Sequence, residues 1–323
     1  MMSPTQMVVR RFFRSKLSIL GLVMVVSLFL FCWVGPLVYT QWGPYDKDYS
    51  TKVSYDPEIT VSFSQNGHDF TFKQVNQTET AMNNLAAPSK SHPLGTDKAG
   101  RDVLARLMQG GQISLTVSFL AVFVILILGT IFGGIAGYFG GWVDLLLMRV
   151  TEIFSSIPFL PFAMILSAIM GSMTLSETTR IFIIMCILGV LTWPGLARLV
   201  RGQVLVARES EYVTAAKAMG VKEGTIAFKH ILPNVMSVIL VNLMLNFGTC
   251  MLTESTLSYL GFGIAPPTPT WGNMLTGANN SVVIQQYWWR WVFPATVFGI
   301  CTICINLVGD ALRDAVDPKT NGR

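Results

Sequence analysis

The feature that most constrains this chain is a series of long apolar runs separated by polar segments. A helix needs about 20 mainly apolar residues to cross a bilayer. Because a backbone in lipid must satisfy its own hydrogen bonds, each such run favours a helix. Only 13% of the residues are charged, whereas a soluble domain has about a quarter. We therefore predict an all-α polytopic membrane protein with six transmembrane helices, near 17–38, 112–137, 155–170, 181–199, 235–257 and 292–308.

The charges that flank these runs predict the orientation of the chain. The first sixteen residues contain no acid and four bases: Arg10, Arg11, Arg14 and Lys16. An excess of Lys and Arg marks cytoplasmic segments, so residues 1–16 form a predicted cytoplasmic N-tail. The run at 17–38 has no small-x-small cleavage site before Trp42, which favours a retained transmembrane helix over a signal peptide.

The polar segment at 39–110 is predicted to be an external insert containing β-structure. Apolar residues alternate with polar ones on both sides of Asn66-Gly67, a dipeptide that favours a tight hairpin turn: Val61, Phe63, Phe70 and Phe72. His92, further along, could in principle bind a metal, but no His or Cys partner lies near it in the sequence. We favour a structural turn ahead of the next helix.

A second polar segment, Glu209–Asn234, lies between two membrane-length runs and is here named the elbow. Its first half contains helix formers up to Met219, with Gly220 as a predicted stop because glycine adopts positive φ without strain. Three residues recur on one predicted outward face, with Ala215 and Ala218 beside it: Tyr212, Ala216 and Met219. A second helix is expected from Lys222 towards Pro233. An ordinary amphipathic surface helix remains the alternative.

Several strings in the chain resemble bacterial ABC importer permeases. The run Ala215-Ala216-Lys217-Ala218-Met219-Gly220, followed by Ile231-Leu232-Pro233, is similar to the loop with which these permeases dock onto an ATPase. Thr214 stands where that family has a Glu. Three further strings resemble the peptide-type members: His92–Asp97 with Gly100-Arg101-Asp102, Leu257–Gly263, and Trp271–Leu275.

The chain thus resembles the C-type permease subunit of dipeptide, oligopeptide and nickel importers, which implies the type I ABC importer fold. The resemblance divides the chain after its first helix into the external insert 39–110, a five-helix permease core 111–312 with a cytoplasmic coupling loop 207–234, and a cytoplasmic tail 313–323. It also implies a multi-pass protein of the bacterial inner (plasma) membrane with both termini cytoplasmic.

The implied function is uptake of peptides, with nickel or another small solute as the alternative. The implied partners are a second homologous permease, two cytoplasmic ATP-binding subunits and an external solute-binding protein. The sequence contains no G-x-x-x-x-G-K-[ST] loop, so ATP and Mg are expected to be used by the partner ATPases. We expect a non-catalytic subunit with no cofactor, no metal site and no nucleic-acid partner.

Two groups of residues are candidate sites. The resemblance assigns contact with the ATPase to Glu211, Tyr212, Ala215, Ala216, Met219, Gly220, Ile231, Leu232 and Pro233. Polar or proline positions inside spans are candidates for the pathway or for a subunit interface: Pro158, Pro161, Asn242, Asn246 and Glu254. Either proline could line the pathway or simply kink its helix. Glu254 is expected to lie within reach of water, with a hydrogen bond to the partner subunit as the favoured role.

Other functions require features that the spans lack. An intramembrane enzyme would need paired carboxylates or a nucleophile with its base, yet Glu254 and Asp310 fall at opposite ends of their helices. A stand-alone secondary transporter would not need the elbow.

Glycines at 129, 133, 134 and 137 predict close helix packing in the second span. Cys301 and Cys304 lie within the last span, which favours packing over redox or metal chemistry.

Overall fold

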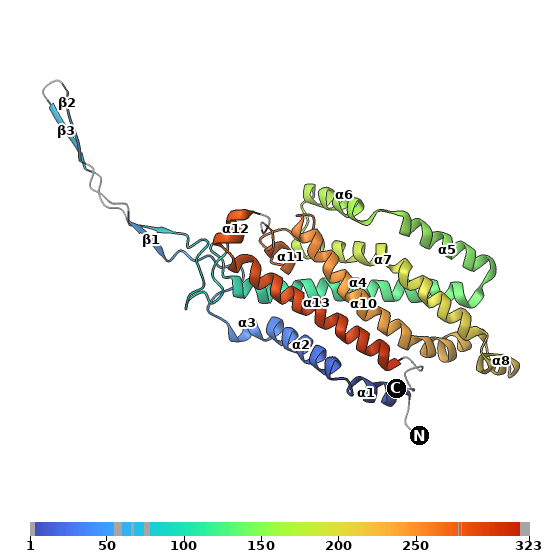
Figure 1. Ribbon diagram of the computed structural model, residues 1–323. Coiled ribbons are helices and arrows are strands. Elements are labelled where there is room, and N and C mark those ends of the chain that lie inside the picture. Colours follow the sequence, from blue (N-terminus) through green and yellow to red (C-terminus); the bar gives the residue numbers. More distant parts are fainter. Residues whose placement is uncertain are drawn as a thin grey trace.

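The long apolar runs form helices. The computed structural model describes residues 4–54, 60–65, 68–73, 78–276, 278 and 280–316. Within them, five helices are long and apolar enough to cross a membrane: α2 (Lys16–Trp33), α4 (Val103–Phe139), α7 (Glu177–Arg208), α10 (Leu232–Tyr259) and α13 (Trp289–Val316). Helices α5 (Gly141–Ser156) and α6 (Phe159–Ser172) make a sixth span if the pair, bent by 72°, is counted as one. The predicted fold class is confirmed (Figure 1).

The helices do not end where the apolar runs end. Helix α4 begins well before residue 112, because the Asp102 carboxylate caps it by accepting a hydrogen bond of 2.8 Å from the backbone N–H of Ala105. The first span is shorter than the predicted 17–38. Helix α2 stops at Trp33, and a separate short helix, α3 (Gly35–Val38), has a proline in its first turn. Hydropathy marks the part in hydrocarbon, whereas caps and prolines set the helix ends.

Helices α4 and α7 pack closely against each other. A Cβ placed on Gly137 would lie 2.8 Å from the carbonyl oxygen of Arg201, and one on Gly129 would lie 2.8 Å from Leu196. Gly133 similarly faces the carbonyl of Ala197. Close packing was predicted for four glycines of this span. For Gly134 the prediction was wrong, because no atom lies within 4 Å of a Cβ placed on it.

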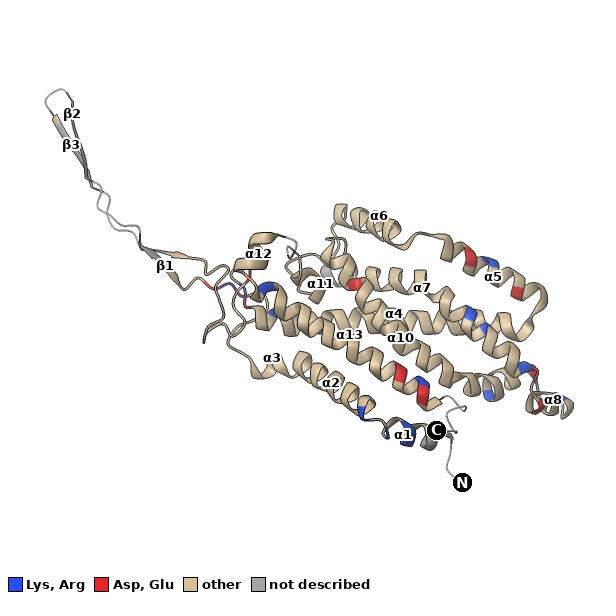
Figure 2. Cartoon of the chain, in the orientation of Figure 1, with Lys and Arg blue, Asp and Glu red and all other residues tan. Residues whose placement is uncertain are grey.

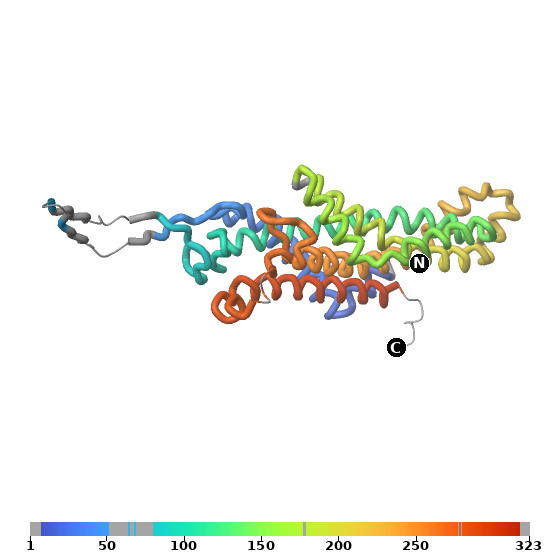
Figure 3. The backbone as a smooth tube through the Cα atoms, turned by 90° about the horizontal axis from the view of Figure 1, so that it is seen from above, coloured from blue at the N-terminus to red at the C-terminus, as the bar shows by residue number. Residues whose placement is uncertain are grey.

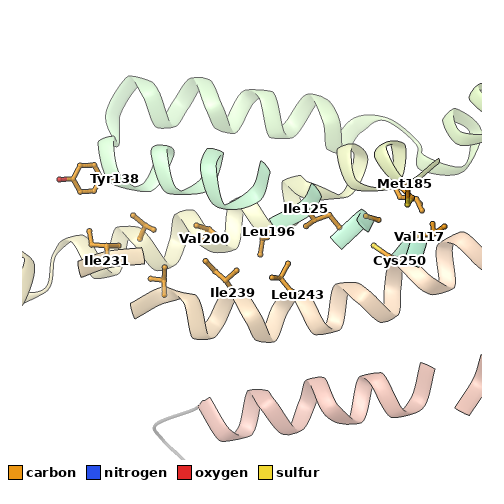
Figure 4. Packing of buried hydrophobic residues seen from close by; sticks show 14 of the residues in the cluster. Val117, Ile125, Tyr138, Met185, Leu196, Val200, Ile231, Ile239, Leu243 and Cys250 are labelled. Carbon is orange, nitrogen blue, oxygen red and sulfur yellow. The ribbon is translucent and has the colours of Figure 1, made fainter. Parts of the chain in front are cut away.

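Buried apolar side chains from α4, α7 and α10 form the larger core cluster (Figure 4). It contains Val117 and Ile125 of α4, Leu196 and Val200 of α7, and Ile239 of α10. A smaller cluster joins α2, α4 and α13 through Cys32, Leu107, Met251, Trp271 and Cys301, with Trp271 at the start of α11 (Trp271–Met274). All five cysteines are free thiols.

The segment after α3 carries two antiparallel strand pairs. Strand β1 (Thr51–Ser54) pairs with β4 (Thr78–Ala81), and β2 (Thr60–Gln65) pairs with β3 (His68–Lys73). The register of the second pair places Phe63 opposite Phe70 and Val61 opposite Phe72, which confirms the predicted hairpin. The turn residues Asn66 and Gly67 lie outside the described residues.

The helical bundle has two distinct ends, named here the insert end and the elbow end. The strand pairs and α12 (Ser281–Gln286) lie at the insert end, while α8 (Glu211–Ala218) lies at the opposite end (Figures 1 and 3). The basic N-tail forms a helix, α1 (Pro4–Phe12), which packs against the last part of α13. The predicted tail at 313–323 begins inside α13, which continues to Val316.

Candidate functional site

The first half of the elbow is a short helix with a defined stop. Helix α8 (Glu211–Ala218) is followed by Gly220 at φ +75°. The N–H of Gly220 donates to the carbonyl of Lys217 at 2.9 Å, and the N–H of Val221 donates to that of Ala216 at 3.1 Å. These two bonds form a Schellman motif, which needs a residue at positive φ. The predicted stop at Gly220 is confirmed.

The face that α8 turns inward is not the predicted one. Val213 and Ala216 are 0% and 3% exposed and belong to the larger core cluster with Ile226 and Ile231. Val213 and Ala216 are three residues apart, so they share one side of the helix. Ala216 was predicted on the outward face beside Tyr212, and this was wrong. Its small side chain instead lets α8 approach the rest of the elbow closely.

The second half of the elbow leads directly into a membrane helix. A short turn, α9 (Glu223–Thr225), is followed by a π-helical segment, η1 (Ile226–Ile231), and then by α10. Three residues that the resemblance assigned to contact with the ATPase lie here: Ile231 is buried, Leu232 is half-buried and Pro233 is exposed in the first turn of α10. The elbow is therefore continuous with the span that follows it.

The outward surface of the elbow combines apolar and charged side chains. Tyr212 is 40% exposed, Met219 is 76% exposed and Phe228 is 73% exposed. Charged residues of the elbow are exposed as well: Glu211, Lys217, Lys222, Glu223 and Lys229. Figure 2 shows charged positions on and near α8. Ala215 is exposed among them and adds little bulk. Thr214 is exposed as well, and its hydroxyl donates to the carbonyl of Ser210 at 3.2 Å.

Polar bonds hold this end of the bundle together behind the elbow. Asp144 of α5 forms a paired salt bridge with Arg201 of α7. Arg208, the last residue of α7, donates to the carbonyl of Tyr138 in α4 at 2.9 Å. The amide of Asn234 donates to the Tyr212 hydroxyl at 3.1 Å, so α8 is tied to the start of α10.

At the insert end, a group of polar side chains forms what we name the insert-base cluster: the half-buried Tyr39 and the buried Asp48, His92 and Asp102. His92 is 0% exposed, and its Nδ1 lies 2.8 Å from Oδ2 of Asp102. Its Nε2 lies 3.1 Å from Oδ2 of Asp48, and the Tyr39 hydroxyl donates to Asp102 at 3.1 Å. Asp48 comes just before β1, while Asp102 caps α4, so the cluster joins the insert to the core.

His92 was expected in a structural turn, and its ring hydrogen bonds to two carboxylates at the base of the insert. No group of three His, Cys, Asp or Glu side chains suited to a metal ion occurs among the residues that the structure describes. Sequence analysis did not find Tyr39 and Asp48, since neither is near His92 in the chain. Burial alone would raise the pKa of Asp48, but hydrogen bonds from Asn83, His92 and Ser50 outweigh it and lower the pKa to about 2.

Glu254 was predicted to be within reach of water and to bond to a partner subunit, and both points were wrong. Its side chain is buried, with the residue 1% exposed. The Ser258 hydroxyl donates to it at 2.7 Å and the Ser255 hydroxyl at 3.3 Å. Hydroxyls of Ser114 and Thr270 also hydrogen bond to this carboxylate, so it joins α10 to α4 and to the start of α11.

The other pathway candidates form two pairs, one at the start of α6 and one within α10. Pro158 caps the start of α6, and Pro161 lies in its first turn, so both belong to the 72° bend between α5 and α6. Asn246 donates to the side-chain oxygen of Asn242 at 2.7 Å, one turn earlier in α10. Both asparagines are half-buried. Whether any of these residues lines a pathway stays a prediction.

Comparison with known proteins identifies two matching families. Residues 129–322 match the family described as "binding-protein-dependent transport system inner membrane component". Residues 3–57 match the "N-terminal TM domain of oligopeptide transport permease C".

Individual relatives extend over most of the chain. The oligopeptide transport system permease protein of Haemophilus influenzae is 35% identical over 312 residues, covering 96% of this chain and 87% of its own. The dipeptide transport system permease protein of Bacillus subtilis is 35% identical over 320 residues, covering 98% and 87%. A glutathione transport system permease protein of Pectobacterium atrosepticum is 38% identical over 232 residues, covering 72% and 74%.

Proposed function

The chain belongs to the family of inner-membrane components of binding-protein-dependent ABC transport systems, and from this premise we propose that it is a permease subunit of a peptide importer. The substrate class rests on the relatives, whose names give oligopeptides, dipeptides and glutathione as transported solutes. The last of these is itself a small peptide. We infer that the solute is a short peptide rather than nickel. None of these three relatives has a name that mentions a metal, and the described residues contain no metal-binding group.

The observation that carries the proposal is the surface of the elbow. Apolar side chains as exposed as Met219 and Phe228 are expected in contact with lipid or with another protein. The charged residues between them would be unfavourable in hydrocarbon, so a protein is the better partner. We propose that this partner is a cytoplasmic ATP-binding subunit, with Glu211, Tyr212, Ala215, Met219 and Gly220 at the contact.

The implied assembly has two permeases, two ATP-binding subunits and an external binding protein. In it, the elbow end faces the cytoplasm, together with both termini, and the insert end faces outward. ATP binding by the partner subunits would move the elbow, and α10 would move with it because the two are continuous. Such coupling requires contacts that differ between the two states of the transporter. Nucleotide and Mg are handled by the partners in this proposal.

The test is copurification followed by uptake. A C-terminal tag on the chain is expected to recover a second permease and ATP-binding subunits from its own host in mild detergent. Reconstituted with the binding protein, the complex is expected to take up labelled di- or tripeptides only with ATP inside. Recovery of the chain alone would contradict the assembly. Recovery of the full complex that transports a metal ion but no peptide would contradict the substrate class.

A further inference from the structure

A small cavity, with a mainly apolar wall that also carries several charged side chains, lies at the insert end of the bundle. Its volume is about 150 Å³. The turn before α4, the first turn of α4, the loop after α10 and the first turn of α13 all contribute to its wall. Four cations and one acid line it: Lys98, Arg101, Arg106, Arg290 and Asp97.

The single acid of the cavity is already shared. Oδ2 of Asp97 accepts from Nε of Arg101 at 2.9 Å and from Nη2 of Arg101 at 2.8 Å. Nε of Arg106 lies 3.4 Å from the same oxygen. Arg106 also donates to two carbonyls, of Pro44 and Pro267. One carboxylate thus serves two guanidinium groups, and the cavity keeps an excess of positive charge.

Arg290 is the guanidinium of the cavity with the least compensation. Its side chain is half-buried at the start of α13, and among the described residues no hydrogen bond or ion pair to its guanidinium is found. The acid that acts on it electrostatically is Asp97, whose Oδ2 is taken by Arg101 and Arg106. Partial burial of a guanidinium without a hydrogen-bonding partner is unfavourable, so an anion entering this cavity would be stabilised.

The uncharged polar groups of the wall are engaged elsewhere. The amide of Asn273 donates to the carbonyls of Ile264 and Thr268, and the Ser258 hydroxyl donates to Glu254. The groups left to meet a ligand are therefore the cations. A guanidinium presents parallel donors that match the two oxygens of a carboxylate.

We propose that this cavity binds the terminal carboxylate of the peptide that is to be imported. This rests on the proposed function, which makes a peptide the solute and the insert end the outer face. A cavity of about 150 Å³ admits a carboxylate with a small part of the last residue and no more. Arg101 and Arg106 are only 8% and 4% exposed, so the site is recessed and favours a chain end over the surface of a folded protein.

The first experiment measures binding to the whole importer complex in nanodiscs, without the binding protein. The ligands are acetyl-Ala-Ala as the free acid and acetyl-Ala-Ala amide, detected by saturation-transfer NMR of their methyl groups. The free acid is expected to bind saturably, and Arg290→Gln is expected to weaken it about tenfold, as for loss of a charge-assisted hydrogen bond. Lys90→Gln, an exposed cation at the same end, is the matched control and is expected to leave binding unchanged.

Two results would overturn the carboxylate site: equal binding of acid and amide by the wild type, or no effect of Arg290→Gln. Because Arg290→Gln could act on folding, Arg290→Lys serves as a second variant and is expected to retain part of the preference for the acid.

An uptake assay separates the peptide from the other source of a carboxylate. In proteoliposomes, Arg290→Gln is expected to raise the KM for free-acid peptides and to leave the half-saturating concentration of binding protein unchanged. A shift in the binding-protein concentration alone would mean that an acidic side chain of that protein occupies the cavity, and the proposal would be overturned. A wild-type complex that transports no peptide would instead contradict the proposed function.

Discussion

The insert and helix α8, which lie at opposite ends of the bundle, are attached to it by different forces. At the insert end, Asp48, His92 and Asp102 are each at most 3% exposed and are joined by directional hydrogen bonds. At the elbow end, α8 is attached mainly through the apolar side chains of Val213 and Ala216, and its outward side chains are exposed. Directional polar bonds fix a geometry, while apolar burial is non-directional. The insert end should therefore tolerate substitution less well than the elbow.

Removing the imidazole of His92 should have the largest effect. In His92→Ala the buried carboxylates of Asp48 and Asp102 lose their shared partner, which should cost about 3 kcal/mol or more. Thermal unfolding in detergent and the amount of protein in the membrane would report the loss. Ser91→Ala, at the exposed neighbouring position, should change stability by less than about 0.5 kcal/mol. If the two variants were similarly stable, the hydrogen bonds of His92 would not be what holds the insert end in place.

Gly220→Val should affect function more than folding. A β-branched residue at positive φ costs about 1–2 kcal/mol, and no atom lies within 4 Å of the added Cβ, so the cost is conformational rather than steric. The chain should remain in the membrane while ATP hydrolysis by the complex is uncoupled from uptake. Gly224→Ala, at a helical position with open space, is the control and should transport normally. Normal transport by Gly220→Val would show that the elbow geometry is not used.

Two adjacent alanines offer a sharper test of how the elbow lies. A cysteine in place of Ala215 should react with a soluble maleimide about tenfold faster than one in place of Ala216, since access to the thiol controls the rate. Four of the five native cysteines are buried, which keeps the background low. Bound ATP-binding subunits should protect the cysteine at 215. Equal labelling of the two isolated variants would mean that α8 does not pack on its inward face.

The smallest expected effect is a dependence of stability on pH that comes from the insert end. Because the folded-state pKa of Asp48 is about 2, below the unfolded value of about 3.9, its contribution to stability is complete above pH ~4. It is lost as the pH falls from ~4 to ~2. The melting temperatures of the wild type and Asp48→Asn should therefore converge over that interval and differ by a constant amount between pH 5 and 7. Melting temperatures that already converge at pH 6 would contradict the low pKa assigned to Asp48.

Local signals in the sequence predicted local structure well. Gly220 marked the end of α8 because a Schellman motif needs only neighbouring residues. The β2–β3 register followed from alternation around Asn66-Gly67. The elbow's inward face was missed, because the i, i+4, i+7 spacing of Tyr212 and Met219 identifies an apolar stripe without saying what covers it. In the fold, Val213 and Ala216 meet the core instead.

Long-range polar contacts could not be predicted from the sequence. Glu254 is bonded by hydroxyls from Ser114 and Thr270, and Asp48 approaches His92 across 44 positions of the chain. A lone acid near a helix end gives no indication of such partners, so exposure was the default expectation for Glu254. The ends of the helices could not be predicted from hydropathy either. The residue that caps α4, Asp102, lies outside the apolar run from which this helix was predicted.

Helix α4 has a mechanical consequence. With 37 residues at 1.5 Å each, it is a rod of about 55 Å, nearly twice the thickness of the hydrocarbon layer. One tip is fixed to the insert through Asp102, and the other accepts the hydrogen bond of Arg208 beside the elbow. A tilt of about 10° about its midpoint would displace both tips by about 5 Å in opposite directions. As long as α4 stays straight, a displacement of one of its ends also displaces the end on the other side of the membrane.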